Sequence, residues 1–189
     1  PSFRHSAVVR KDLGIATAFN FLGPLTNPAQ PLYAAVGVAD ARMAPLVAGV
    51  FAGRGKDAAV FRGDDGLDEL TTSGTSSVWW VQGGQVQEFT LSPEMLGLST
   101  HPVSELRGAD AQHNAGVARR LFDGEEGAPR VAVLLNAGIA LAVADETQQP
   151  TSQEEFVAAV AGGVARAAEA IDSGQAAALI GRWAAATTA

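Results

Sequence analysis

The feature that most constrains the fold is an acidic segment, Gly-Asp-Asp-Gly-Leu-Asp-Glu-Leu at residues 63–70, directly after an apolar run at residues 58–61. The run is typical of a buried strand, and the glycines let the chain turn sharply as it leaves a sheet. Ligands of α/β folds usually bind at the carboxyl ends of strands. Adjacent carboxylates there repel one another unless a cation or hydrogen-bond donors compensate, and Mg²⁺ commonly binds one or two carboxylates plus water and substrate phosphates. The segment therefore indicates a metal site or, alternatively, a solvated acidic turn.

The composition is that of an ordinary globular protein, since 17% of the 189 residues are charged and 47% are hydrophobic. The net charge of −7 argues against nonspecific nucleic-acid binding. No apolar run reaches the ~20 residues that a membrane-spanning helix needs. There is no cysteine, which excludes a disulfide framework and a thiolate metal cluster and fits a cytoplasmic location. We therefore expect neither a nucleic-acid partner nor a membrane partner.

The pattern of the chain predicts an α/β fold in a single domain. Buried strands are expected at residues 33–39 and 58–61, and the clearest hairpin signal joins residues 78–82 to 85–89 across Gly83-Gly84. This hairpin adds an antiparallel excursion to the sheet, with Trp79 and Trp80 on opposite faces.

Helices are expected on both sides of these strands. Capping patterns and apolar periodicity support them, including a capping box at residues 151–154. The pair Gly162-Gly163 falls inside a helix pattern and is interpreted as a packing feature. Asn114 and Asn136, also in helical contexts, are expected to satisfy buried backbone groups. The expected helices are residues 3–13, stopped by Gly14; from about Asp40 to Gly53, with Pro45 in the first turn; Asp110 to Phe122; residues 131–144; from the capping box to Asp172; and a last helix through Leu179, Ile180 and Trp183.

Residues 19–28, with the sequence Phe-Asn-Phe-Leu-Gly-Pro-Leu-Thr-Asn-Pro, are expected to form a stiff loop. Two prolines fix φ, and Gly23 permits close approach of the backbone. A structural loop packed by its own apolar side chains explains this pattern. A wall of a pocket for a flat aromatic ligand, with Gly23 and Pro24 at its surface, is the functional alternative.

Arg10 lies on the first expected helix among alanines and valines. Its guanidinium can bind a carboxylate with two hydrogen bonds, which suits recognition of a small acid. A surface arginine that covers apolar neighbours with its stem is equally consistent, and Arg4 or Lys11 could serve the same purpose. The chain has no glycine-rich phosphate cradle of the P-loop or dinucleotide type.

Taken together, these segments resemble the anthranilate phosphoribosyltransferases, specifically the carboxyl-terminal part of that family. The resemblance extends over essentially the whole chain. The loop at residues 20–28 and the Asp-Gly-Leu-Asp-Glu run at residues 65–69 are specific in combination. Further support comes from residues 4–14, 108–115 and 134–138.

The resemblance implies a mostly parallel central sheet flanked by helices. It also implies that Asp68 and Glu69 bind Mg²⁺ engaged with the pyrophosphate of phosphoribosyl pyrophosphate (PRPP). Arg10 would contact the carboxylate of anthranilate, with Gly23 and Pro24 beside the anthranilate channel. No residue of this chain is assigned as a catalytic acid or base.

The start at Pro1, on residues already helical in pattern, predicts that residues 1–189 are the carboxyl-terminal part of the large α/β domain of a longer chain. By resemblance, the phosphate loop and the amino-terminal helical domain, through which such enzymes form homodimers, are absent. This chain alone is then expected to be inactive. Two alternatives stay open: a related pyrimidine nucleoside phosphorylase, against which the loop at residues 20–28 argues, and a fragment without catalytic function.

Overall fold

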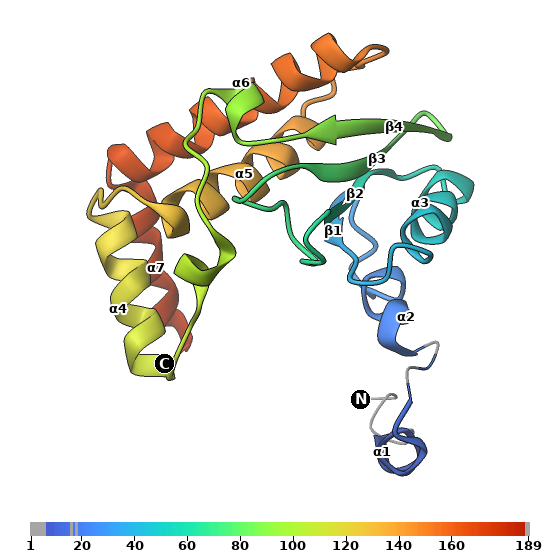
Figure 1. Ribbon diagram of the computed structural model, residues 1–189, viewed down its shortest axis with the longest axis horizontal. Coiled ribbons are helices and arrows are strands. Elements are labelled where there is room, and N and C mark those ends of the chain that lie inside the picture. The colour runs from blue at the N-terminus through green and yellow to red at the C-terminus, as the bar shows by residue number, and fades with distance from the viewer. Residues whose placement is uncertain (1–6, 16, 18, 188–189) are drawn as a thin grey trace.

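The computed structural model describes residues 7–15, 17 and 19–187. Helices cover both faces of one sheet (Figure 1). The expected residues 3–6 of the first helix lie outside the described part. In chain order the elements are α1 (Ala7–Leu13), α2 (Phe19–Leu25), β1 (Tyr33–Gly37), α3 (Ala44–Gly53), β2 (Asp57–Gly63), β3 (Ser76–Gln82), β4 (Gln85–Leu91), the 3₁₀ turns η2 (Glu94–Leu96) and η3 (Val103–Leu106), α4 (Ala111–Phe122), α5 (Ala128–Val143), α6 (Gln153–Asp172) and α7 (Gln175–Thr187).

The sheet has the strand order β1-β2-β3-β4, in which β1 and β2 are parallel and the other two pairings are antiparallel. The α/β class and the antiparallel hairpin are confirmed, but within the described chain the sheet is mixed rather than mostly parallel. A parallel crossover needs a long connection, usually a helix. The connection from β2 to β3, residues 64–75, contains no helix, so β3 returns antiparallel to β2.

The hairpin between β3 and β4 forms where the sequence predicts it. Gly83 and Gly84 have φ values of 55° and 78°, which is the conformation that a tight hairpin turn requires and that glycine adopts without strain. The two tryptophans point to opposite faces as expected. Trp80 lies in the core beneath α5 and α6, whereas Trp79 packs on the side of α3.

The larger core lies between the sheet and the pair α5 and α6. Phe156 of α6 is fully buried, stacks on Phe89 with ring centroids 4.5 Å apart, and meets Trp80 edge-on at 5.7 Å. A smaller core on the opposite face joins α3 to the sheet through Val47 and Phe51. Burial of both faces gives β2 its nearly continuous apolar sequence.

The expectation of a loop at residues 19–28 is wrong for its first part, because residues 19–25 form α2 with Pro24 inside it. Pro24 falls in the last turn of this seven-residue helix, where its missing N–H removes one bond from a short ladder. The Thr26 hydroxyl donates to the Leu22 carbonyl oxygen at 2.7 Å and closes the end. Asn27 and Pro28 then form the expected turn, with Ala29 N–H donating to Asn27 Oδ1.

Several helix boundaries are confirmed by their caps. Asp110 accepts a hydrogen bond from the His113 N–H at 2.8 Å at the start of α4. At the start of α6 the box is shifted by one residue from the expected register: Ser152 caps the Glu155 N–H, and the Glu155 carboxylate accepts from Thr151. Asp40 does not cap α3, whose N-cap is Met43. Within the described residues, no helix is both long and apolar enough to cross a lipid bilayer.

Candidate functional site

The acidic segment forms a tight loop at the carboxyl end of β2. The Gly63 N–H donates to the Leu67 carbonyl oxygen and the Gly66 N–H to that of Gly63, both at 2.9 Å. Gly66 has a φ of 101°, which a residue with a side chain rarely adopts. The sequence prediction of a sharp turn after the buried strand is therefore confirmed.

The first two acids of this loop are used to hold it together. Asp64 accepts hydrogen bonds from Thr75 and from Ser77, the latter at 3.1 Å. Asp65 accepts from the hydroxyls of Thr71 and Ser73 and from the Leu67 N–H. Burial acts to raise the pKa of Asp65, but these hydrogen bonds outweigh it and lower that pKa. Both carboxylates therefore have structural roles within the loop.

Asp68 and Glu69 differ from that first pair. Both are exposed, and neither side chain has a hydrogen bond or ion pair with any described residue. The Glu69 carboxyl is nevertheless partly desolvated by the surrounding loop, and this desolvation together with the neighbouring charge of Asp68 raises its pKa. Among the described residues no group of three metal-ligating side chains gathers. Two adjacent, uncompensated carboxylates are the donor set that Mg²⁺ uses when water and substrate phosphates complete its shell, so these residues fit that ion.

The backbone of this pair is held at two points. At the peptide that joins the two residues, the Asp68 carbonyl oxygen lies against Gly37 at the end of β1, so close that a Cβ on Gly37 would sit 1.6 Å from that oxygen. After the pair, the Leu70 N–H donates to Asn136 Oδ1 on α5 at 3.2 Å. The expectation that Asn136 satisfies a backbone group is confirmed. The importance of Gly37 was not predicted, because only the fold brings the end of β1 to this loop.

The other predicted site residues lie elsewhere. The backbone of Arg10 belongs to α1, and its side chain lies outside the described part. Gly23 and Pro24 belong to α2, and Pro24 borders a cavity of about 530 Å³ that is also lined by Arg54 and Lys56. Lys56 directly precedes β2, so this cavity lies at the amino end of the parallel strands. The acidic pair lies at the opposite, carboxyl end of these strands. The structure therefore does not bring Gly23 and Pro24 together with Asp68 and Glu69.

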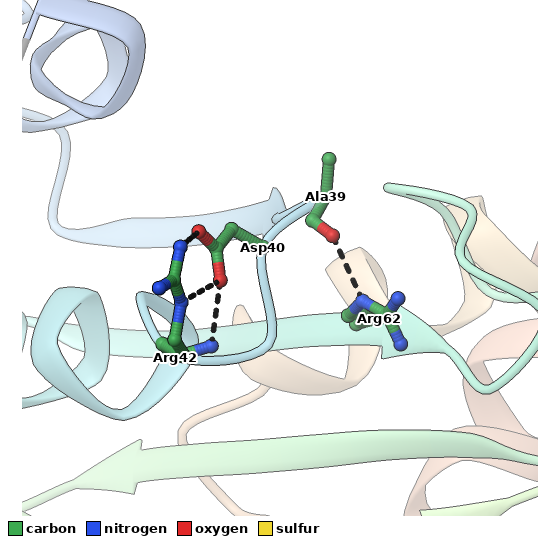
Figure 2. A network of polar contacts seen from close by, with 4 residues as sticks. All are labelled: Ala39, Asp40, Arg42 and Arg62. Carbon is green, nitrogen blue, oxygen red and sulfur yellow. Dashed lines mark hydrogen bonds and ion pairs between the residues drawn. The ribbon is translucent and has the colours of Figure 1, made fainter. Parts of the chain in front are cut away.

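Figure 2 shows two arginines near the carboxyl ends of β1 and β2, of which Arg62 contacts the start of the acidic loop. Arg62 donates from Nε to the Ala39 carbonyl oxygen at 2.9 Å and from Nη1 to that of Gly63 at 3.1 Å. Arg42 forms a bidentate ion pair with Asp40: its Nε donates to Oδ1 at 3.0 Å and its Nη2 donates to Oδ2 at 2.7 Å. The side-chain and backbone hydrogen bonds from Arg42 lower the pKa of Asp40 to about 2.

The comparison with known families decides the assignment of the chain. The sequence model described as "Glycosyl transferase family, a/b domain" matches residues 1–177. The chain belongs to this family. The α/β sheet, with the acidic loop at the carboxyl end of β2, is thus the architecture of a glycosyl transferase domain.

Two similar proteins of this glycosyl transferase family carry the same name. Anthranilate phosphoribosyltransferase of Nocardioides sp. is 57% identical over 187 residues, which is 99% of this chain and 53% of that protein. The Streptomyces griseus enzyme of the same name is 56% identical over the whole chain and 52% of its own length. The chain therefore spans about half the length of the curated relatives that it matches.

Solved structures agree with this glycosyl transferase fold. The crystal structure of anthranilate phosphoribosyltransferase from Thermus thermophilus is 35% identical, with a TM-score of 0.79 over 100% of this chain and 53% of that one. The Saccharomyces cerevisiae enzyme in complex with PRPP and Mg is 28% identical, with a TM-score of 0.69 over 92% of this chain and 52% of its own. A structure of the yeast enzyme in complex with 4-fluoroanthranilate covers the same shares of the two chains, with 26% identity and a TM-score of 0.70.

Substitution Gly37→Ala should displace the acidic loop of this glycosyl transferase domain. The added Cβ would collide with the Asp68 backbone, which has no rotamer through which to move away. We expect a loss of about 1–3 kcal/mol in the free energy of unfolding, measured by urea denaturation. Gly49→Ala in α3 is the control, because its Cβ would meet nothing within 4 Å. Equal stability of the two variants would contradict the close approach of β1 and the loop.

Substitution Arg42→Ala should return the pKa of Asp40 from about 2 towards its ordinary 3.8, as measured by NMR titration of the carboxyl carbon. Because the pKa is lowered in the folded state, the ionised form stabilises the fold above about pH 4, and this contribution fades as the pH falls towards about 2. The Arg42 side chain is 88% exposed, so added salt should weaken the pairing in the parent. A midpoint that neither salt nor the substitution moves would contradict this ion pair.

Proposed function

We propose that this glycosyl transferase domain is the carboxyl-terminal part of an anthranilate phosphoribosyltransferase. The full-length enzyme would transfer the phosphoribosyl group of PRPP to anthranilate in tryptophan biosynthesis, giving N-(5-phosphoribosyl)anthranilate and pyrophosphate. The observation that carries this proposal is the pair Asp68 and Glu69, two unpartnered carboxylates on a firmly held loop at the carboxyl end of β2. The relatives at 56% and 57% identity support the choice of substrates.

The reaction asks little covalent chemistry of the protein. The amine of anthranilate attacks C1 of the ribose, the bond from C1 to the pyrophosphate oxygen breaks, and the amine loses a proton. Positioning of the two substrates and neutralisation of the leaving group supply most of the acceleration. Mg²⁺ held at Asp68 and Glu69 would act as a Lewis acid for the oxygens of the pyrophosphate. We assign no catalytic acid or base to this chain.

The acceptor would be recognised by the first part of the chain. Arg10 is proposed to bind the anthranilate carboxylate, since a guanidinium matches a carboxylate with two parallel hydrogen bonds. Gly23 and Pro24 are proposed to border the channel through which the aromatic ring enters. These residues would meet the acidic loop only through the two substrates.

The rest of the site is proposed to come from a longer chain. Residues 1–189 would be the carboxyl-terminal part of the large α/β domain, with the phosphate loop and a helical dimerisation domain upstream. The full-length enzyme would be a cytoplasmic homodimer without nucleic-acid or membrane partners. Residues 1–189 alone are then expected to be inactive, and addition of the upstream half in trans should restore turnover.

Product analysis separates this proposal from its nearest alternative. The full-length enzyme is incubated in one arm with anthranilate, PRPP and Mg²⁺, and in the other with a pyrimidine nucleoside and phosphate. We expect phosphoribosyl anthranilate and pyrophosphate from the first arm and no reaction in the second. Release of a free pyrimidine base would overturn the proposal in favour of a nucleoside phosphorylase.

A further inference from the structure

The orientation of the acidic pair depends on its backbone. Asp64 and Asp65 are fixed by hydrogen bonds to hydroxyl groups, but the side chains of Asp68 and Glu69 have no such bond to any described residue. Their directions therefore depend on the backbone, which is held at the peptide between Asp68 and Glu69 and at the peptide that follows Glu69. A metal site tolerates displacements of only about 0.5 Å in its ligands, so whatever holds these peptides matters for binding.

Asn136 holds the peptide group that follows Glu69. Its Oδ1 accepts the Leu70 N–H at 3.2 Å, while its Nδ2 donates to the Ala132 carbonyl oxygen one turn earlier in α5 at 2.9 Å. The second bond fixes the direction of the amide, because a flipped side chain would set its Nδ2 against the Leu70 N–H and its Oδ1 against a carbonyl oxygen. The Asn136 amide therefore presents its oxygen, in a single orientation, to the Leu70 N–H at the end of the acidic loop.

The support behind this acceptor is rigid. Asn136 lies in the middle of α5, next to Leu135, which is fully buried against the sheet and α6. Leu70, whose N–H it binds, is also buried, with 2% of its surface exposed. The link therefore connects the acidic loop to the main core across 66 residues of sequence.

We propose that Asn136 is a positioning residue for the metal-binding pair Asp68 and Glu69. Loss of its acceptor would leave the Leu70 N–H unpaired at a half-buried site, and the peptide between Glu69 and Leu70 would rotate to find another partner. That rotation carries the Glu69 carboxylate away from its place beside Asp68. The inference rests on the proposed function, since it assumes that the pair binds a divalent cation with pyrophosphate.

Three variants of the full-length enzyme test this role. Asn136→Ala removes both the acceptor and the donor, whereas Asn136→Asp keeps Oδ1 for the Leu70 N–H and loses only the Nδ2 donor to the Ala132 carbonyl oxygen. Gln153→Ala is the matched control. Its amide also bonds backbone groups from a helix, accepting from Thr90 N at 3.2 Å and donating to Thr90 O at 2.6 Å, but on β4 at the far edge of the sheet.

The first measurement is titration with Mn²⁺ in the presence of pyrophosphate, followed by electron paramagnetic resonance. We expect Asn136→Ala to weaken Mn²⁺ binding by about 10-fold, which is the usual effect of removing a group that orients metal ligands. Gln153→Ala should bind as the parent does, and Asn136→Asp should lose less affinity than Asn136→Ala because it keeps the acceptor. The second measurement is hydrogen exchange by mass spectrometry without metal, in which the peptide containing Leu70 should exchange fastest in Asn136→Ala and as in the parent in Gln153→Ala.

The outcomes separate this inference from the proposed function. If Asn136→Ala binds Mn²⁺ like the parent, and its Tm falls no differently from that of Gln153→Ala, Asn136 is merely structural and the inference is overturned. If the parent itself does not bind Mn²⁺ with pyrophosphate, the assignment of the metal to Asp68 and Glu69 is wrong, and the inference that depends on it is overturned as well. Faster exchange at Leu70 together with weaker Mn²⁺ binding, both smaller in Asn136→Asp than in Asn136→Ala and absent in Gln153→Ala, supports the positioning role.

Discussion

Joint replacement of Asp68→Asn and Glu69→Gln in the full-length enzyme is expected to lower kcat/KM for PRPP by at least about 100-fold. A metal acting as a Lewis acid contributes several kcal/mol to the stabilisation of developing charge, and each 1.4 kcal/mol is about tenfold in rate. The fold should be retained, because neither side chain bonds to another described residue. Steady-state kinetics at varied Mg²⁺, with circular dichroism for the fold, measure both effects.

A control for net charge accompanies this pair. Glu88→Gln with Asp123→Asn also removes two negative charges, from β4 and from the end of α4, and should leave kcat/KM unchanged. If both double variants lose activity equally, the effect is one of overall charge. If the Asp68 and Glu69 variant keeps the parent's kcat/KM at every Mg²⁺ concentration, the metal assignment is wrong.

Substitution Gly163→Ala is expected to destabilise the fold by about 2 kcal/mol or more, although alanine favours a helix over glycine by about 1 kcal/mol. α5 and α6 touch here through their backbones. A Cβ on Gly163 would lie 2.1 Å from the Gly138 carbonyl oxygen, and one on Gly138 would lie 2.5 Å from Val164 Cγ2. Since a carbonyl group cannot change rotamer, the two helices must separate. Thermal unfolding should show a Tm lower by roughly 4–8 °C.

The neighbouring residue provides a control of opposite sign. Gly162→Ala lies in the same helix, but its Cβ would meet nothing within 4 Å. That variant should gain about 0.5–1 kcal/mol from helix propensity alone. Opposite signs at adjacent positions would confirm the backbone contact, and a stabilising Gly163→Ala would contradict it.

Local features of the fold could be predicted from the sequence because each rests on nearby residues. The turn at Gly83-Gly84 needs positive φ, and Asp110 can cap only the helix that follows it. The sharp turn of the acidic loop also follows from local chemistry, since glycine after a buried strand permits the positive φ seen at Gly66. The packing interpretation of Gly162-Gly163 holds for the second glycine only, because the first faces open space.

Other features depend on long-range contacts that no local pattern contains. The direction of β3 depends on whether residues 64–75 contain a helix. The two-turn helix α2 exists in spite of Pro24, a residue whose local signal is that of a helix breaker. Gly37 matters through a backbone segment 31 positions later in the sequence, and only the paired strands bring the two together.

The division of roles among the four acids was likewise hidden. In the sequence Asp64, Asp65, Asp68 and Glu69 are equivalent carboxylates. Hydroxyl donors from Thr71, Ser73, Thr75 and Ser77 satisfy the first pair and leave the second unpaired. The resemblance assigned the metal to Asp68 and Glu69, and this hydrogen-bond pattern supports that choice on physical grounds.

The central claim is tested most directly by anthranilate fluorescence during incubation with PRPP and Mg²⁺. The full-length enzyme and residues 1–189 alone are compared under the same conditions, each checked for folding. Consumption of anthranilate by the full-length enzyme only, and its loss when Mg²⁺ is chelated, is the predicted result. A well-folded, Mg²⁺-replete full-length enzyme that consumes no anthranilate would contradict the assignment of this acceptor.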